Sequence, residues 1–248
     1  MALARFQDLC LDVTDEGRQA AFWSSALGLT LHEGRSDPAV LVGATPQQSL
    51  WLNTVPEPKT VKHRVHLDVH TESVEALEAL GATVVVPATP EQRWTVMADP
   101  EGGEFCAFVR SPERLQPYRL YEVCVDCADP GSVARWWGRV LGLSVGNDPE
   151  HDWWWLEPAS ASAGNRAADG GGRGTDRGAS DPGLPFESLV FVAVPEPKTG
   201  KNRLHWDVQT PSVAVLVEAG ATIVAERPDW TVLADPEGNE FCAFPDGG

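Results

Sequence analysis

The sequence has little positive charge and no long apolar run. Its 248 residues hold 19 Lys and Arg against 36 Asp and Glu, which gives a formal net charge of −17. Such a chain repels the phosphates of nucleic acids and the surfaces of anionic lipids. No stretch approaches the roughly 18 apolar residues of a membrane-spanning helix, and the first residues lack the apolar run and cleavage site of a signal peptide. We therefore expect neither nucleic acid nor a membrane as a partner.

Cysteines and catalytic motifs are also scarce. The five cysteines are an odd number spread through the chain, which argues against a disulfide framework and favours a cytoplasmic location. The sequence contains no GxSxG nucleophile elbow, no phosphate-binding P-loop and no GxGxxG after a strand. Hydrophobic residues make up 42% of the chain, which is enough for globular cores, and the length suits two domains of about 120 residues.

What the sequence does contain is an internal repeat of more than 100 residues. VPEPKTVKHRVHLDV at 55–69 matches VPEPKTGKNRLHWDV at 194–208 at eleven of fifteen positions. Three further pairs of segments match: FWSSALGL with WWGRVLGL, GATVVV with GATIVA, and DPEGGEFCAF with DPEGNEFCAF. A period of this length predicts duplicated domains and excludes the short-period solenoids.

The copies differ mainly by an insertion in the second. Residues 158–184 are rich in Gly, Ala, Ser and Asp and hold almost no large apolar side chain, so we expect a disordered loop there. The changing offset between the matched segments places this loop inside the second copy. We therefore predict a first domain at 1–112, a linker at 113–118 and a second domain at 119–248.

Each copy alternates strand-like and helix-like segments. DLCLDV (8–13) and EVCVDC (122–127) have the alternation of strands. The helix that follows in copy two should begin at Asp129-Pro130 and end at Gly142. The second helix of each copy should begin at Thr71 or Thr210, and end at Gly81 or Gly220.

These two strands, the FW…LGL helix, the RxHxDV strand and the ADPEG…EFC ending resemble the vicinal-oxygen-chelate superfamily, above all its tandem glyoxalase-like domains. The resemblance covers both copies apart from the 158–184 loop and the short joint. It implies an α+β fold of two tandem domains, each made of paired βαβββ-type modules that form a cupped mixed sheet around a small ligand.

The resemblance also implies four cup-facing positions where metal-using relatives place ligands, in the pattern His or Gln, Glu, His, Glu. Here those positions carry Asp8 and Glu122, Trp51 and Val190, His66 and His205, and Cys106 and Cys242. Only the third type is kept, so we expect no metal and no cofactor. Two trios still offer the three protein ligands of a catalytic zinc site: Asp8, His66 and Cys106, and Glu122, His205 and Cys242. Alternatively, the cysteines are small buried apolar residues.

The repeated His-x-Asp places an imidazole and a carboxylate on one face of a strand, as His66 with Asp68 and as His205 with Asp207. A neighbouring carboxylate raises the pKa of a histidine, which suits acid–base work or the anchoring of a polar ligand. The alternative is that each aspartate caps the helix that follows, three residues before its expected start. The preceding VPEPKT segment is expected to be a turn whose Lys and Arg side chains are mostly solvated.

The ten tryptophans are many for this length, and several stand on predicted strands. Large rings that line a cup suit the stacking of planar or hydrophobic molecules. With the polar residues above, they complete the predicted ligand-binding set: Asp8, Trp51, His66, Asp68, Trp94, Cys106, Glu122, His205, Asp207, Trp230 and Cys242.

The sequence therefore predicts a small-molecule-binding protein of the glyoxalase/bleomycin resistance type. It would sequester or recognise an aromatic or hydrophobic metabolite or antibiotic without a metal. The alternatives are a lyase, isomerase or dioxygenase that uses His66 and His205 with a divalent metal, and a structural module whose cups are filled by side chains. The two copies are expected to form a pseudo-dimer within one chain, and further dimerisation is left open.

Overall fold

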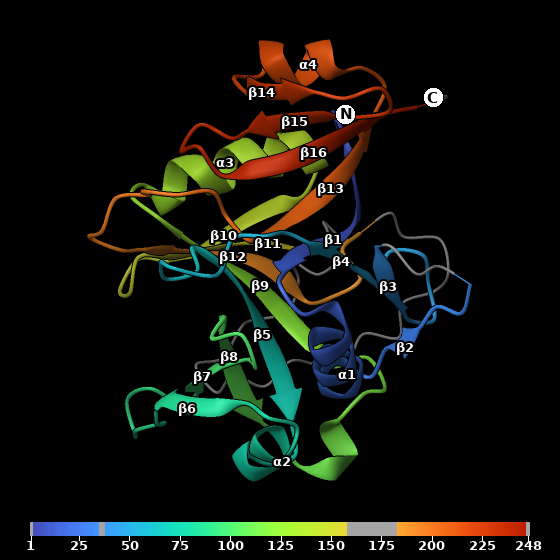
Figure 1. Ribbon diagram of the computed structural model, residues 1–248. Helices are drawn as coiled ribbons and strands as arrows, with labels where there is room; N and C mark the ends of the chain where they lie inside the picture. The colour runs from blue at the N-terminus through green and yellow to red at the C-terminus, as the bar shows by residue number, and fades with distance from the viewer. Residues whose placement is uncertain (1, 35–37, 158–182, 247–248) are drawn as a thin grey trace.

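The computed structural model describes residues 2–34, 38–157 and 183–246 (Figure 1). Most of the predicted loop at 158–184 lies outside the described residues. The first copy contains β1 (Arg5–Val13), α1 (Glu16–Leu27), β2 (Thr30–Leu31), β3 (Ala39–Val42), β4 (Ser49–Thr54), β5 (Val65–Thr71), α2 (Val74–Ala79), β6 (Thr83–Val86), β7 (Thr95–Ala98) and β8 (Glu104–Val109). After a 3₁₀ turn at Pro112–Arg114, the second contains β9 (Leu120–Cys127), α3 (Pro130–Leu141), β10 (Ser144–Asp148), β11 (Trp153–Glu157), β12 (Ser188–Ala193), β13 (Leu204–Thr210), α4 (Val213–Glu218), β14 (Thr222–Glu226), β15 (Thr231–Ala234) and β16 (Glu240–Pro245).

The described strands form two mixed sheets of eight, which confirms the predicted α+β fold of paired βαβββ modules. One sheet has the order β14-β15-β16-β13-β1-β4-β3-β2, and the other β10-β11-β12-β9-β5-β8-β7-β6. Each sheet joins the first half of one copy to the second half of the other. We call the concave face of the sheet that contains β1 and β13 cup 1, and that of the sheet with β5 and β9 cup 2. The copies thus form an intertwined pseudo-dimer (Figure 1).

Antiparallel pairing between copies lies at the centre of each sheet. Across β1 and β13, Asp8 pairs with Asp207 and Cys10 with His205. The matching pair of strands is β5 and β9 in the other sheet. Because the halves cross over, the predicted trios are wrong as groups: Asp8 shares a cup with His205 and Cys242, and Glu122 shares one with His66 and Cys106.

The largest aromatic contacts of the first helices, in contrast, lie within their own copy. In copy one, Phe22 and Trp23 of α1 meet Phe105 of β8 at ring distances of 5.8 and 5.3 Å. In copy two, Trp137 of α3 meets Trp206 at 4.7 Å and Phe241 at 4.9 Å. Truncating such a buried ring to alanine typically costs about 3–5 kcal/mol. Helix packing therefore joins the two halves of a copy, while strand pairing joins the two copies.

The first helix of copy two has the ends that the sequence predicted. In copy two, Asp129 is the N-cap and accepts from the Ser132 amide, and Gly142 ends the helix in the left-handed conformation at φ 68°. The second helices are different, because their N-caps are Ser73 and Ser212. The expected start at Thr71 or Thr210 is wrong, since these residues end strands β5 and β13.

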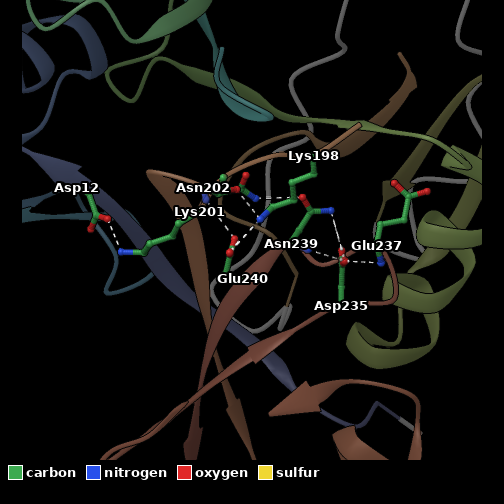
Figure 2. Close-up of polar contacts among 9 residues, drawn as sticks. Asp12, Lys198, Lys201, Asn202, Asp235, Glu237, Asn239 and Glu240 are labelled. Carbon is green, nitrogen blue, oxygen red and sulfur yellow. Dashed lines mark hydrogen bonds and ion pairs between the residues drawn. The ribbon is translucent and has the colours of Figure 1, made fainter. Parts of the chain in front are cut away.

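The DPEG turns hold the helix starts in place. The Glu237 carboxylate accepts from the amides of Ala128 and Asp129 at 2.7 and 2.5 Å. Asp235 closes its own turn by accepting from the amides of Glu237 and Asn239, both at 2.9 Å (Figure 2). A carboxylate at a helix N-terminus satisfies free amides and complements the helix dipole, so this turn fixes the helix to the second half of its copy.

The VPEPKT segments tie the copies together. The guanidinium of Arg64 donates to the Glu196 carbonyl at 2.6 Å, and that of Arg203 donates to the Glu57 carbonyl at 2.7 Å. The expectation of solvated lysines is wrong at Lys198, which is 15% exposed and pairs with Glu240 at 2.9 Å (Figure 2), and Lys59 pairs with Glu104 in the same way. The two arginine bonds thus join these loops across the copies, whereas the two lysine pairs lie within a copy.

One polar contact differs between the copies in a complementary way. In copy two, the Asn202 side chain donates to Asn239 at 3.0 Å (Figure 2). In copy one the matching residues are His63 and Gly103, and a Cβ on Gly103 would lie 2.7 Å from His63 Cε1. The imidazole thus uses space that an asparagine side chain fills in the other copy. Burial lowers the pKa of His63 to about 4.

This complementarity predicts strong coupling between two substitutions. His63→Asn alone leaves a gap, and Gly103→Asn alone clashes with the imidazole, so each should destabilise the fold. The double variant should recover about 1 kcal/mol or more relative to the sum of the single effects, as measured by urea unfolding. Additive effects of the two substitutions would contradict the proposed fit.

The low pKa of His63 also predicts a dependence of stability on pH. Because its folded-state pKa is about 4 and its ordinary value is 6.5, His63 should lower the stability of the fold as the pH falls from about 6.5 toward about 4. This loss of stability should be absent from the double variant, which has no imidazole at this position.

Candidate functional site

The floor of cup 1 is a compact set of buried polar groups. Cys10 Sγ lies 3.4 Å from Asp207 Oδ2, and Cys242 Sγ lies 3.5 Å from His205 Nε2. His205 Nε2 is 3.6 Å from Asp207 Oδ1. Strand alternation explains the set, because Asp8 and Cys10 point into the cup while Leu9 and Leu11 enter the apolar core. Neighbouring strands thus bring two acids, two thiols and one imidazole together.

Cup 2 has a matching floor. His66 Nε2 lies 3.5 Å from Asp68 Oδ1, and Asp68 pairs with Glu122 across β5 and β9. Glu122 accepts from the Ser188 hydroxyl at 2.6 Å. Cys106 pairs with Asp68 across β5 and β8. Each His-x-Asp therefore has a second acid on one neighbouring strand and a thiol on the other.

The protonation of these groups differs from the sequence expectation. Burial lowers the pKa of His205 to about 4 and lowers that of His66. Burial and the neighbouring Asp8 charge raise the pKa of Asp207 well above its usual value, and burial and Glu122 do the same for Asp68. The predicted carboxylate–imidazolium pair is therefore wrong, because desolvation outweighs the attraction. The helix-capping alternative is also wrong, since serines cap those helices.

The four positions at which metal-using relatives carry ligands do not all hold a metal-binding residue in cup 1. In cup 1 they fall on Asp8, Trp51, His205 and Cys242, and Trp51 Nε1 donates to Asp8 Oδ2 at 2.9 Å. A cation would face an N–H donor at the second position, so the family's four-ligand set does not fit this cup. Other donor atoms lie within 4.8 Å of one another and could hold a cation: Cys10, His205 and Asp207 in cup 1, and His66 with Asp68 and Cys106 or with Cys124 and Asp126 in cup 2.

A cavity of about 780 Å³ opens beside the floor of cup 1. Of the eleven predicted ligand-binding residues, only Asp8 and Trp51 line it. Its wall also includes Phe6, Gln7, Val40, Val42 and Gln209. His205, Asp207 and Cys242 lie in the floor, and Trp230 stacks on Phe244 at 5.9 Å. The remaining predicted residues belong to cup 2, namely His66, Asp68, Trp94, Cys106 and Glu122.

Each central strand pair contains a β-bulge, and the side chains at and beside the bulge differ between the two cups. The register across β1 and β13 slips at Gln7, and that across β5 and β9 slips at the matching Tyr121. Bulges redirect a side chain near a site. Gln7 lines the cavity of cup 1, whereas Tyr121 stacks on His70 at 4.4 Å. At the position of His70, cup 1 has Gln209. Cup 2 therefore holds two rings where cup 1 holds two amides.

The cavity residues Gln7 and Gln209 were missed because nothing in the alternation of a single strand marks a bulge. A comparison of the two copies could have found them. The floor thiols and histidines are the same in both copies, while the positions around the cavity change: Gln7 to Tyr121, Trp51 to Val190, and Gln209 to His70.

The chain belongs to the family of glyoxalase-like domains, since the model of that family matches residues 8–108 and 122–244. The whole chain is similar in fold to the crystal structure of glyoxalase I from Zea mays. The TM-score is 0.63 at 15% identity, over 98% of this chain and 92% of that one. A structure from Bacillus subtilis subsp. subtilis str. 168 gives 0.62 at 11% identity, over 100% and 86%. At such identities the likeness shows the fold alone.

No curated protein matches the sequence. In the described part of the chain, no helix is long and apolar enough to cross a membrane.

The raised pKa of Asp207 gives a testable dependence of stability on pH. A carboxyl whose pKa is raised by folding binds more protons in the folded state, so its contribution to stability is lost as the pH rises through the folded-state value. The stability of the wild type relative to Asp207→Asn should therefore fall as the pH rises above 3.8, the ordinary pKa of this carboxyl, as measured by urea unfolding. Asp246→Asn, an acid at the exposed rim, is the control and should follow the wild type. Parallel curves for Asp207→Asn and wild type would refute this.

Proposed function

We propose that the chain binds an aromatic or hydrophobic small molecule in cup 1, as a protein of the glyoxalase/bleomycin resistance type. The observation that carries this proposal is the cavity of about 780 Å³ beside Trp51. Binding cavities for small molecules are mostly apolar, with a few polar groups, and measure about 300–1,000 Å³. The half-buried Trp51 ring and the side chains of Phe6, Val40 and Val42 offer apolar wall.

Several features support binding by side chains, with no metal needed to hold the ligand. The Trp51 N–H occupies a family metal position and fixes the Asp8 carboxylate beside the cavity. Cup 2, with Tyr121 and His70 stacked in place of the two glutamines, is the structural partner in this proposal. All five cysteines are free thiols, which supports a reducing compartment such as the cytoplasm.

A second candidate is a divalent-metal lyase, isomerase or dioxygenase. The observation in its favour is the convergence of Cys10, His205 and Asp207, whose donor atoms lie within 4.8 Å of one another. Thiolate, imidazole and carboxylate together are a ligand set that suits zinc.

Refilling cup 1 with the residues of cup 2 should abolish binding. In Gln7→Tyr/Gln209→His, the rings of Tyr121 and His70 are copied into the cavity wall. The uncharged probe N-phenyl-1-naphthylamine should bind the wild type at about one site per chain and lose at least about tenfold in affinity in this variant, as followed by its fluorescence. The matched control, Tyr121→Gln/His70→Gln, changes cup 2 and should leave the first site within about twofold. Equal binding to all three proteins would reject cup 1 as the site.

Elemental analysis separates the two candidates. Purified without chelator, the chain should carry far less than one transition-metal ion per molecule if cup 1 binds by side chains alone. A stoichiometric ion that disappears in both Cys10→Ser and His205→Ala would instead establish the metal-dependent candidate, because each variant removes one ligand of the trio.

A further inference from the structure

Two glutamines from neighbouring strands stand in the wall of the cup 1 cavity. Gln7 lies at the bulge of β1, and Gln209 lies on β13, opposite the start of β1. Both line the cavity. The matching residues of cup 2 are Tyr121 and His70, whose rings stack at 4.4 Å. Cup 1 therefore presents two uncharged amides where the other cup is filled by rings.

Neighbouring side chains decide which end of each amide is left over. The Gln7 side chain donates a hydrogen bond to Asp8, so its Nε2 is engaged and its Oε1 is the remaining group. Gln209 Oε1 accepts from Arg5 Nη2 at 3.1 Å. A guanidinium offers donors only, so this bond fixes the oxygen of Gln209 and leaves its N–H groups. Gln7 therefore offers an acceptor, and Gln209 offers a donor.

The acceptor of Gln7 has no use within the described chain. Its Oε1 is buried and has no hydrogen-bond partner among the described residues. Other polar groups of the wall are engaged: Ser49 Oγ donates to the Pro46 carbonyl at 2.6 Å. Asp8 also accepts from Trp51 Nε1 at 2.9 Å. Buried amide oxygens are normally hydrogen-bonded, so the Gln7 oxygen marks the place of a donor that comes from outside the chain.

An apolar surface continues from the two amides across the sheet. Trp51 stands on β4, the strand next to β1, and pairs with Val40 on β3. Asp8 accepts from both Gln7 and Trp51, so it holds the amide and the ring beside each other. Neighbouring strands lie about 4.8 Å apart, so β1 and β3 are about 10 Å apart. That span suits a body of two fused rings with a polar group at one end.

Resting on the proposed function, we propose that the ligand of cup 1 is a neutral, flat aromatic molecule with an amide edge, as in a lactam. Its N–H donates to Gln7 Oε1, its carbonyl accepts from Gln209 Nε2, and its rings lie against Trp51. A lactam carries one donor and one acceptor side by side, which complements the two glutamines. Rings stack on tryptophan. A site built on hydrogen bonds rejects analogues that lack them, because its own polar groups then stay unpaired.

Three bicyclic probes of nearly equal size test the proposal. They are the lactam 2-quinolinone, coumarin, in which a ring oxygen replaces the N–H, and naphthalene, which has neither group. Each is titrated calorimetrically in competition with N-phenyl-1-naphthylamine. The lactam should bind at least about tenfold more tightly than coumarin or naphthalene, because the ring oxygen of coumarin sets an acceptor against Gln7 Oε1.

Two variants separate the two hydrogen bonds. Gln7→Met removes the acceptor and should lower the affinity for 2-quinolinone by about tenfold or more, with less than about threefold change for naphthalene. Gln209→Met removes the donor and should weaken both 2-quinolinone and coumarin, since both carry the carbonyl. Gln209 is exposed, so this variant keeps the test decisive if Gln7→Met does not fold. Gln47→Met, the same change at an exposed position of the cavity wall, is the control and should preserve the order of the three affinities.

The outcomes distinguish this proposal from the binding function itself. If N-phenyl-1-naphthylamine binds and 2-quinolinone competes no better than coumarin, the amide class is wrong while the binding function stands. An equal loss of all three probes in Gln7→Met would also contradict the proposal, because the residue would then act only through the shape of the wall. If N-phenyl-1-naphthylamine does not bind, or binds Gln7→Tyr/Gln209→His unchanged, the binding function of cup 1 fails, and the amide proposal fails with it.

Discussion

The structure depends on the antiparallel pairing of β1 with β13 and of β5 with β9. These pairings place a first-half strand of one copy beside a second-half strand of the other at the centre of each sheet. The backbone ladder brings Asp8 next to Asp207 and Cys10 next to His205, and so it builds the floor of cup 1. A slip of one residue would turn every one of these side chains to the opposite face. The bulge at Gln7 belongs to the same ladder, so the cavity wall is set there too.

Contacts within each copy and contacts between the two copies both stabilise the fold. Within a copy, aromatic rings such as Trp137 and Phe241 join a helix to the second half-module, and the DPEG turn holds the start of that helix. Between copies, the connection is made by strand pairing, by the Arg64 and Arg203 bonds to opposite loops, and by ring contacts such as that of His70 with Tyr121. The buried apolar residues of both copies form one continuous core, so both copies are needed for the core and for either cup.

The sequence predicts the parts of this structure that local chemistry decides. The repeat, the alternation of β1 and the Asp129 and Gly142 ends of α3 are local signals, and the structure confirms those helix ends. The crossing of the halves could not be predicted, because the strand β13 has the same local sequence features whether it pairs with β1 or with β9. For the same reason the ligand trios were assembled from the wrong strands. The protonation of the His-x-Asp groups failed for another reason: desolvation is a property of the folded environment, and no spacing reveals it.

The fusion of two copies into one chain has a consequence for how such a site can change. In a symmetric homodimer, every substitution appears in both cups, so neither can lose a function that the other needs. Here the residues at the two bulges differ, as Gln7 and Tyr121. Each cup is built from its own set of positions, so a substitution in one cup leaves the other unchanged. One cup can therefore be filled by side chains such as rings, while the residues that line the other cup change independently. Covalent linkage thus removes the symmetry requirement while keeping the strand pairing between the copies.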